Sequence, residues 1–180
     1  MAAGRRWSIL DTAPASSRSL AAFGQRSSRV VVLGTGEGVR PVTGGRIVDA
    51  LRGDLAAFGR EPFDLVLLWD LLNYFSGADL PALAEILAGH LRPSARVHLL
   101  ITSSQRVVPP QPGRFEVLPE GGVAVEHSQA ATLPAPRFTP WHLERGLQGF
   151  VIDRSVLLQS GLQEFVLRPV ISGGAAGEAP

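Results

Sequence analysis

The sequence of 180 residues contains neither cysteine nor lysine. Without cysteine there is no thiolate nucleophile, no disulfide and no cysteine-ligated zinc or iron–sulfur site. Without lysine there is no Schiff-base amine, no P-loop lysine and no lysine general base. These two absences exclude many classes of enzyme before any motif is considered.

The sequence also has few histidines and a net charge close to zero. The four histidines include no pair at positions i and i+4, so the helical pair of zinc peptidases is absent and we expect no metal site. The seventeen basic and sixteen acidic residues are spread along the chain, and the net charge is +1. We therefore expect no nucleic-acid partner and no binding to an anionic membrane.

Long apolar runs are also missing. No run approaches the ~18 apolar residues of a transmembrane helix, and the apolar stretch after Arg6 stops at Asp11, too early for a signal peptide. These features favour a cytoplasmic protein. With 45% hydrophobic residues the chain can still bury one sizeable core, and its length is typical of one domain.

The hydrophobic pattern alternates between strands and helices. The clearest strand covers residues 63–69, whose continuous apolar run indicates burial on both faces, as in a parallel sheet. The other predicted strands of the front half cover residues 7–10, 29–33 and 95–102. Helices are predicted at residues 17–24, capped by Ser16 or Ser17, at 47–58, and at 80–91, capped by Asp79. This order predicts an α/β fold with a mainly parallel, Rossmann-like sheet flanked by helices.

The right-handed crossover rule makes the four predicted strands parallel neighbours, with residues 29–33 beside residues 7–10. After Thr102 the chain becomes rich in proline. The predicted elements there are a hairpin at 114–118 and 123–126, a helix at 139–147, a short helix from Asp153 through Gln159, and a last strand at 163–170. We expect one domain at 1–171, with its core at 7–102 and a C-terminal elaboration at 103–171, followed by a disordered tail at 172–180.

Ligands of an open α/β sheet bind beyond the carboxyl ends of the strands. The segment after the second predicted strand begins Gly34-Thr35-Gly36, which is similar to a dinucleotide fingerprint. Val39 stands where that fingerprint requires its third glycine, and no helix is predicted to start directly afterwards. Binding of a nicotinamide dinucleotide is therefore the less favoured interpretation.

Three further stretches occur in a characteristic order: an F-D-L-V strand, the segment W-D-L-L-N-Y-F, and a helix that runs into L-R-P-S-A-R-V. Together with the strand that ends at Asp11, this order resembles the class I S-adenosylmethionine-dependent methyltransferases over roughly residues 7–102. The resemblance implies a methyltransferase-like fold with S-adenosylmethionine as cosubstrate. The positions that it assigns to the cosubstrate are Asp11, Thr12, Ala13, Gly34, Asp54, Leu55 and Trp69.

The resemblance also implies roles for single residues. Asp11 falls on the acid that ends the first strand, Gly34 falls where an acid normally grips the ribose, and Asp54 falls where a side chain typically meets the adenine. Asp70 and Asn73 follow the central strand and are the candidate catalytic residues, because they could position a methyl acceptor. The alternative is that both side chains cap the turn after that strand.

The sequence departs from the family at two of these places. The expected glycine-rich turn is Thr-Ala-Pro-Ala-Ser, whose side chains hold a ligand away from the backbone, and Gly34 cannot accept from ribose hydroxyls. The prediction is a degenerate methyltransferase-like protein with weakened or lost cosubstrate binding that serves as a binding or regulatory partner. The expected partner is a protein or a small-molecule acceptor. The alternative is an active small methyltransferase with an unknown acceptor.

Overall fold

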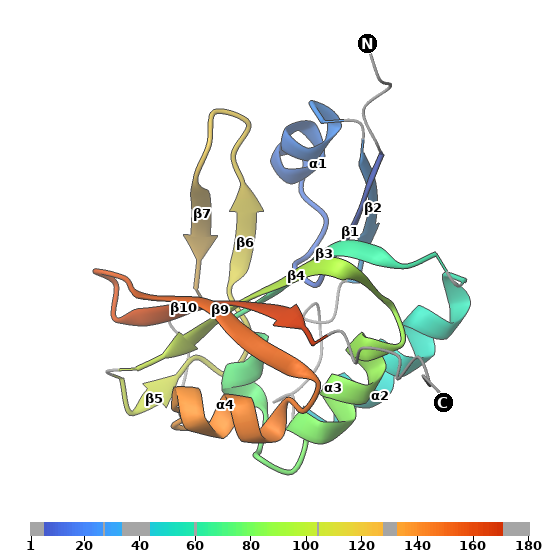
Figure 1. Ribbon diagram of the computed structural model, residues 1–180. Helices are drawn as coiled ribbons and strands as arrows, with labels where there is room; N and C mark the ends of the chain where they lie inside the picture. The colour runs from blue at the N-terminus through green and yellow to red at the C-terminus, as the bar shows by residue number, and fades with distance from the viewer. Residues whose placement is uncertain are drawn as a thin grey trace, which may run out of the picture.

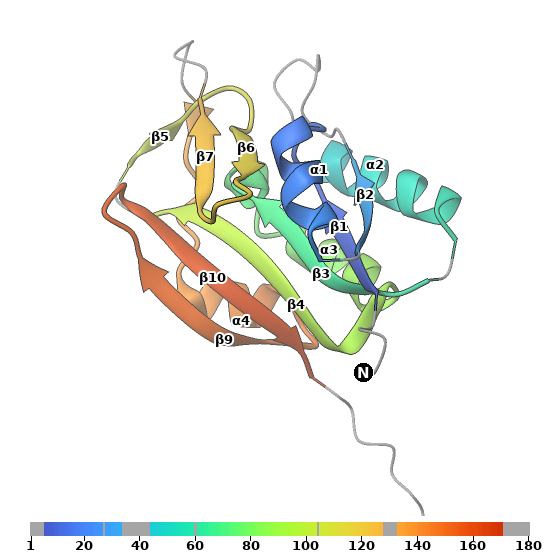
Figure 2. The same ribbon diagram turned by 90° about the horizontal axis from the view of Figure 1, so that it is seen from above.

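The computed structural model describes residues 6–26, 28–33, 44–59, 61–103, 105–127 and 133–170. Its centre is a six-stranded sheet in the order β2-β1-β3-β4-β10-β9 (Figure 2). The strands are β1 (Trp7–Asp11), β2 (Ser28–Val32), β3 (Phe63–Trp69), β4 (Leu91–Thr102), β9 (Phe150–Leu157) and β10 (Leu162–Pro169). The α/β fold predicted from the sequence is therefore confirmed.

The first four strands are parallel, and β2 lies beside β1 at the edge of the sheet, as the crossover rule predicts. β10 lies antiparallel between β4 and β9. The last two strands thus extend the core sheet. The observed sheet differs from the predicted one mainly at the start of β4. This strand begins at Leu91 instead of at residue 95, because Leu91 pairs with Phe63 of β3.

The two faces of the sheet carry different layers (Figure 1). On one face lie α1 (Ser17–Gly24) and the hairpin of β6 (Arg114–Val117) and β7 (Val123–Glu126). The opposite face is covered by α2 (Gly44–Ala57), α3 (Leu80–Ala88) and α4 (Pro140–Gly146). The remaining elements are the 3-10 helix η1 (Leu71–Tyr74) and the short pair β5 (Val107–Val108) and β8 (Leu133–Pro134).

The helix ends follow the capping residues of the sequence. The Ser16 hydroxyl accepts from the amides of Arg18 and Ser19 at the start of α1. Asp79 precedes α3 as predicted, but its carboxylate accepts from the amide and hydroxyl of Ser76 instead of from α3. The prediction that α3 reaches residue 91 is wrong, because the helix ends at Ala88 and the chain turns into β4.

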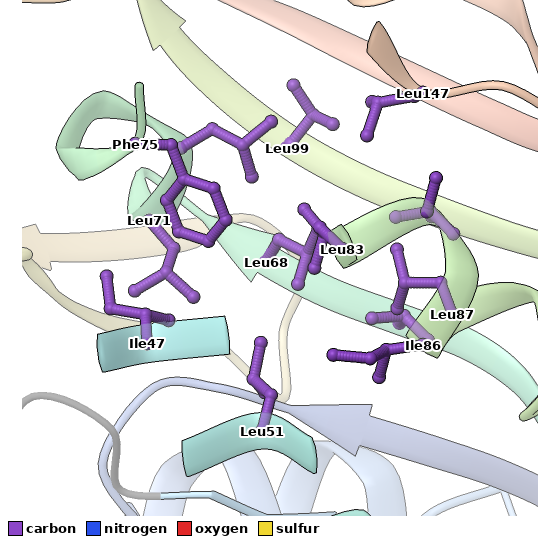
Figure 3. Packing of buried hydrophobic residues seen from close by; sticks show 14 of the residues in the cluster. Ile47, Leu51, Leu68, Leu71, Phe75, Leu83, Ile86, Leu87, Leu99 and Leu147 are labelled. Atoms are coloured by element: carbon purple, nitrogen blue, oxygen red, sulfur yellow. The ribbon is translucent and has the colours of Figure 1, made fainter. Parts of the chain in front are cut away.

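Two apolar clusters hold these layers on the sheet. The larger one lies under α2, α3 and α4, and Figure 3 shows Leu68 and Leu99 of the sheet among helix side chains such as Leu51 and Leu83. The smaller one lies under α1 and the hairpin. Its buried members are Ile9, Ala13, Phe23, Leu67, Trp69, Leu100 and Phe115. β3 is therefore covered on both faces, which explains its unbroken apolar run.

The substitution Leu67→Ala is expected to reduce the free energy of unfolding by about 2 to 3 kcal/mol, because it opens a cavity in the smaller cluster. Urea unfolding of the purified variant measures this loss. Leu20→Ala is the matched control, since Leu20 lies on α1 with 48% of its surface exposed. Equal stability of the two variants would contradict the central position of β3.

The prediction of a helix from Asp153 through Gln159 is wrong. This segment belongs to β9 and to the turn before β10. β9 pairs with β10 on both sides of Asp153, which lies at an irregularity of the ladder, and the carboxylate of Asp153 forms ion pairs with Arg96 and Arg168 across the sheet. Pairing within the sheet therefore outweighs the capping preference of the aspartate.

Two predictions fall on residues outside the described ranges: the ribose position Gly34 and the tail at residues 172–180. Within the described ranges, no helix combines the length and apolar character needed to cross a lipid bilayer.

Candidate functional site

The carboxyl edge of the sheet brings together most of the residues singled out in the sequence. Asp11 ends β1, and Thr12 and Ala13 follow it in the turn to α1. Trp69 ends β3 and is followed by Asp70. All five are buried, and they lie at the place where ligands of open α/β sheets bind.

The carboxylate of Asp11 is held by the chain itself. Its Oδ1 atom accepts a 2.7 Å hydrogen bond from the indole Nε1 of Trp69 and a 3.0 Å bond from the amide of Ala13. Burial raises the pKa of Asp11, and the bonds from Trp69 and Ala13 partly offset this effect. The acid that ends the first strand is thus engaged by a side chain from the neighbouring strand.

Trp69 reaches Asp11 by means of an unusual backbone conformation. Its φ of 50° lies in the left-handed region, which costs a residue other than glycine roughly 1–2 kcal/mol. The indole stacks on Phe115 of β6, with ring centroids 4.9 Å apart and planes 4° apart. The imidazole of His98 makes an edge contact with the indole at a centroid distance of 5.4 Å. The buried ring contacts offset the backbone cost.

The turn between β1 and α1 lies tightly against β3. Both the amide and the hydroxyl of Thr12 donate to the carbonyl oxygen of Leu67, at 3.1 and 3.0 Å. The amide of Ala13 is bound to Asp11, and Pro14 has no amide hydrogen to offer. The first backbone donors of this turn are therefore used within the protein.

Strand β6 fastens the hairpin to the start of α1. The Ser16 hydroxyl donates to the Glu116 carboxylate at 2.7 Å, and the guanidinium of Arg18 lies 3.5 Å from the same carboxylate. The amide of Val117 donates to the hydroxyl of Ser19 at 3.0 Å. A carboxylate of the chain itself thus lies at the amino end of a helix, a position that favours negative charge.

Asp70 does not take the turn-capping role that the sequence leaves open as an alternative. Its side chain makes no capping bond to η1, and its Oδ2 atom accepts instead from the amide of Gly113 at 3.0 Å. A Cβ at position 113 would lie 2.7 Å from the imidazole of His127, so a larger residue there would require this side chain to move. Burial raises the pKa of Asp70 to about 7, and the bond from Gly113 lowers it by less.

Asn73 has a structural role in this arrangement. Its Oδ1 atom accepts from the amide of Thr102 at 3.0 Å, and its amide nitrogen donates to the carbonyl oxygen of Leu100 at 3.4 Å. The side chain therefore ties η1 to the end of β4. This bonding uses both polar atoms of the amide, so Asn73 has less to offer a ligand than Asp70.

A cavity of about 520 Å³ opens beside Asp70, between the ends of β3 and β4 and the inner side of the hairpin. Its walls are largely apolar, and its size is typical of small-molecule sites, which span ~300–1,000 Å³. Within the described residues, no three histidine or carboxylate side chains come together as a metal site would require. The size and the apolar walls of the cavity suit a small organic ligand.

The structure does not bring Asp54 and Leu55 to this edge. α2 begins near Asp79 at the carboxyl edge and ends near Arg29 at the opposite edge, where Arg29 bonds to the carbonyl oxygen of Phe58. Asp54 is exposed in the last turns of this helix, and Leu55 is buried in the larger apolar cluster. These two positions therefore lie apart from the other predicted cosubstrate residues.

Sequence reasoning missed Gly113, Phe115, Glu116 and His127. The hairpin that carries them was predicted, but no local pattern indicates which strand ends a distant hairpin will cover. The signal that could have found them is composition: an aromatic and an acidic residue stand next to each other on a short strand that follows a proline-rich connection.

No family model and no curated protein match the sequence. Solved structures do match. The CcbJ methyltransferase from Streptomyces caelestis is similar with a TM-score of 0.54 and 12% identity, over 91% of this chain and 89% of that chain. The DhpI–SAH complex is similar with a TM-score of 0.53 and 15% identity, over 93% and 79% of the two chains. The chain has a methyltransferase fold.

A third similar structure is the glycopeptide N-methyltransferase MtfA complexed with S-adenosyl-L-methionine, with a TM-score of 0.50, 15% identity, and coverage of 91% of this chain and 87% of that chain. Identities of 12 to 15% extend the similarity to the fold and no further. The methyltransferase fold agrees with the resemblance seen in the sequence. At the turn after β1, where that resemblance expects glycines, this chain has Thr-Ala-Pro-Ala-Ser.

Proposed function

We propose that this chain is a methyltransferase-fold binding protein that has lost the binding of S-adenosylmethionine at the ends of β1 and β3. The observation that carries the proposal is the 2.7 Å bond from the Trp69 indole to the Asp11 carboxylate. This bond holds the indole ring in the crevice at the carboxyl ends of the strands, where ligands of open α/β sheets bind. Phe115 stacks on that ring and covers it from the hairpin side.

The residues around the first turn do not fit the cosubstrate. The turn has side chains in place of glycine, Ala13 is buried, and the amides of Thr12 and Ala13 are bound to other parts of the chain. At the start of α1 the carboxylate of Glu116, which is paired with Arg18, already accepts from the Ser16 hydroxyl. The side chains and the occupied donors of this turn thus oppose binding of the methionine part of the cosubstrate.

An active methyltransferase is the alternative function. It requires the Trp69 ring to leave both Asp11 and Phe115, which would remove a hydrogen bond from a buried carboxylate and expose a large apolar surface. The fold shared with proteins solved in complex with S-adenosylmethionine makes this alternative worth a direct test.

Thermal unfolding in the presence of S-adenosylhomocysteine provides that test. A ligand present at one hundred times its Kd stabilises a protein by ~2.7 kcal/mol, which raises the Tm of a domain of this size by roughly 5–10 °C. We expect no rise in Tm at millimolar S-adenosylhomocysteine. A concentration-dependent rise of several degrees would contradict the proposed loss and favour the active enzyme.

A further inference from the structure

The cavity at the ends of β3 and β4 has an apolar wall and a polar floor. Phe115 and Val125 of the hairpin, with Leu162 of β10, contribute to the wall. Asp70 and Thr102 line the cavity from the sheet side, one at the end of β3 and the other at the end of β4. A ligand in this cavity would therefore meet apolar surface over most of its body and polar atoms at one end.

Two polar atoms of the floor have no hydrogen-bond partner among the described residues. They are the Oδ1 atom of Asp70 and the Oγ1 atom of Thr102, and both are buried. The other carboxylate oxygen of Asp70 is fixed by the amide of Gly113, so the unpartnered oxygen is held in place. Buried polar atoms in native proteins are nearly always bonded, and an unbonded pair beside a cavity indicates a site for a donor group.

The charges of the residues that line the cavity indicate which kind of donor group a ligand would carry. Among the described residues that line it, none is arginine, and the chain has no lysine. His127 is the basic group among the described residues of the wall, and burial lowers its pKa, which disfavours its charged form. The ionised carboxylate of Asp70 therefore has no countercharge within the described wall of the cavity.

We infer that this cavity binds a small organic amine with an apolar body, whose ammonium group pairs with Asp70 and donates to Thr102. An ammonium group has three donors, which is enough for both unpartnered oxygens. A charge-assisted hydrogen bond in a buried site is stronger than a neutral one. The inference names the ligand class of the proposed binding function and rests on it, because the amine is held as a ligand and no methyl donor takes part.

Calorimetric titration of the full chain with three matched compounds tests the inference. These are 2-phenylethylamine, 2-phenylethanol and 3-phenylpropionate, which share an apolar body and carry a cationic, a neutral and an anionic end. The titrations are done at about pH 8, where Asp70 is ionised and a primary amine, with a pKa of about 10, is protonated. We expect the amine to bind at least ~10-fold more tightly than the alcohol, and no binding of the carboxylate.

The variant Asp70→Asn should bind the amine and the alcohol with the same affinity, while Asp49→Asn, which removes an exposed carboxylate from α2, should keep the preference. Thermal unfolding shows whether Asp70→Asn is folded. If it is not, Thr102→Val serves instead, since it removes one of the two acceptors and should weaken amine binding several-fold.

Equal binding of the amine and the alcohol by the wild-type protein, or binding of none of the three compounds, would overturn the inference. The same preparation is titrated separately with S-adenosylhomocysteine. Its binding would contradict the proposed function while leaving the amine site intact. Failure of the amine alone would leave the proposed loss of the cosubstrate intact.

Discussion

The substitution Asp70→Asn is expected to stabilise the protein relative to the wild type increasingly as the pH rises from about 4 to about 7. Burial raises the pKa of Asp70 from 3.8 to about 7. Over this range the folded carboxyl keeps a proton that the unfolded chain has released, so the free energy of unfolding falls as the pH rises. A pKa difference of about three corresponds to about 4 kcal/mol, which is the largest change that we expect.

Urea unfolding of both proteins at several pH values between about 4 and 8 gives the difference in stability. Asp11, whose pKa burial raises, and His98, whose pKa burial lowers, titrate in both proteins, so their contributions cancel in the difference. Asp49→Asn controls for the loss of one negative charge. A difference that stays constant over the whole pH range would show that Asp70 is not buried as described.

The substitution Trp69→Ala should reduce the free energy of unfolding by about 3 to 5 kcal/mol, because it removes a large ring from the smaller apolar cluster. The loss includes the stacking on Phe115 and the hydrogen bond to Asp11. The alanine variant also recovers no backbone strain energy, because alanine is disfavoured at a φ of 50° just as tryptophan is. Chemical denaturation at neutral pH measures the effect.

Two further variants separate the contributions of the ring. Trp69→Phe keeps an aromatic side chain against Phe115 but cannot donate to Asp11, and it should cost about 1 to 3 kcal/mol. Trp141→Ala is the control, since 59% of Trp141 is exposed, and it should cost less than about 1 kcal/mol. If Trp69→Ala were no more destabilising than Trp141→Ala, the ring could not lie in the crevice.

The sheet could be predicted because its strands and the helices between them have distinctive local sequence patterns. The unbroken apolar run of β3 indicates a strand covered on both faces, and the structure places one cluster on each side of it. The helices α1 and α4 follow from Ser16 and Thr139, whose hydroxyls cap them. Once strands and helices alternate, the crossover rule leaves few arrangements of the four parallel strands.

Long-range pairing explains what could not be predicted. Asp153 has the local signature of a helix cap, but its neighbours on both sides pair with β10, and the arginines at positions 96 and 168 bind its carboxylate. The contact of β6 with α1 joins residues about one hundred positions apart, such as Ser16 and Glu116. No pattern within a single segment indicates such a contact, because its energy depends on packing that only the whole fold provides.

The candidate site was predicted in part. The sequence singled out the strand ends, and the structure brings Asp11, Trp69 and Asp70 together there. The sequence could not show that Trp69 turns toward Asp11, because that contact depends on a φ of 50° and on the hairpin above it. The resemblance also suggested adenine contacts for Asp54, which lies on α2 toward the opposite edge of the sheet.

The central claim is that the Trp69 indole fills the crevice of the sheet, and its Nε1 hydrogen can be observed directly by NMR. The chain has three tryptophans, and Trp7 and Trp141 are 51% and 59% exposed, so their indole signals are internal references. The spectrum of Trp69→Phe identifies the signal of Trp69. We predict that this signal exchanges with deuterated water far more slowly than the other two and does not move when S-adenosylhomocysteine is added. Exchange as fast as that of the exposed tryptophans, together with a shift on addition of the ligand, would contradict the account.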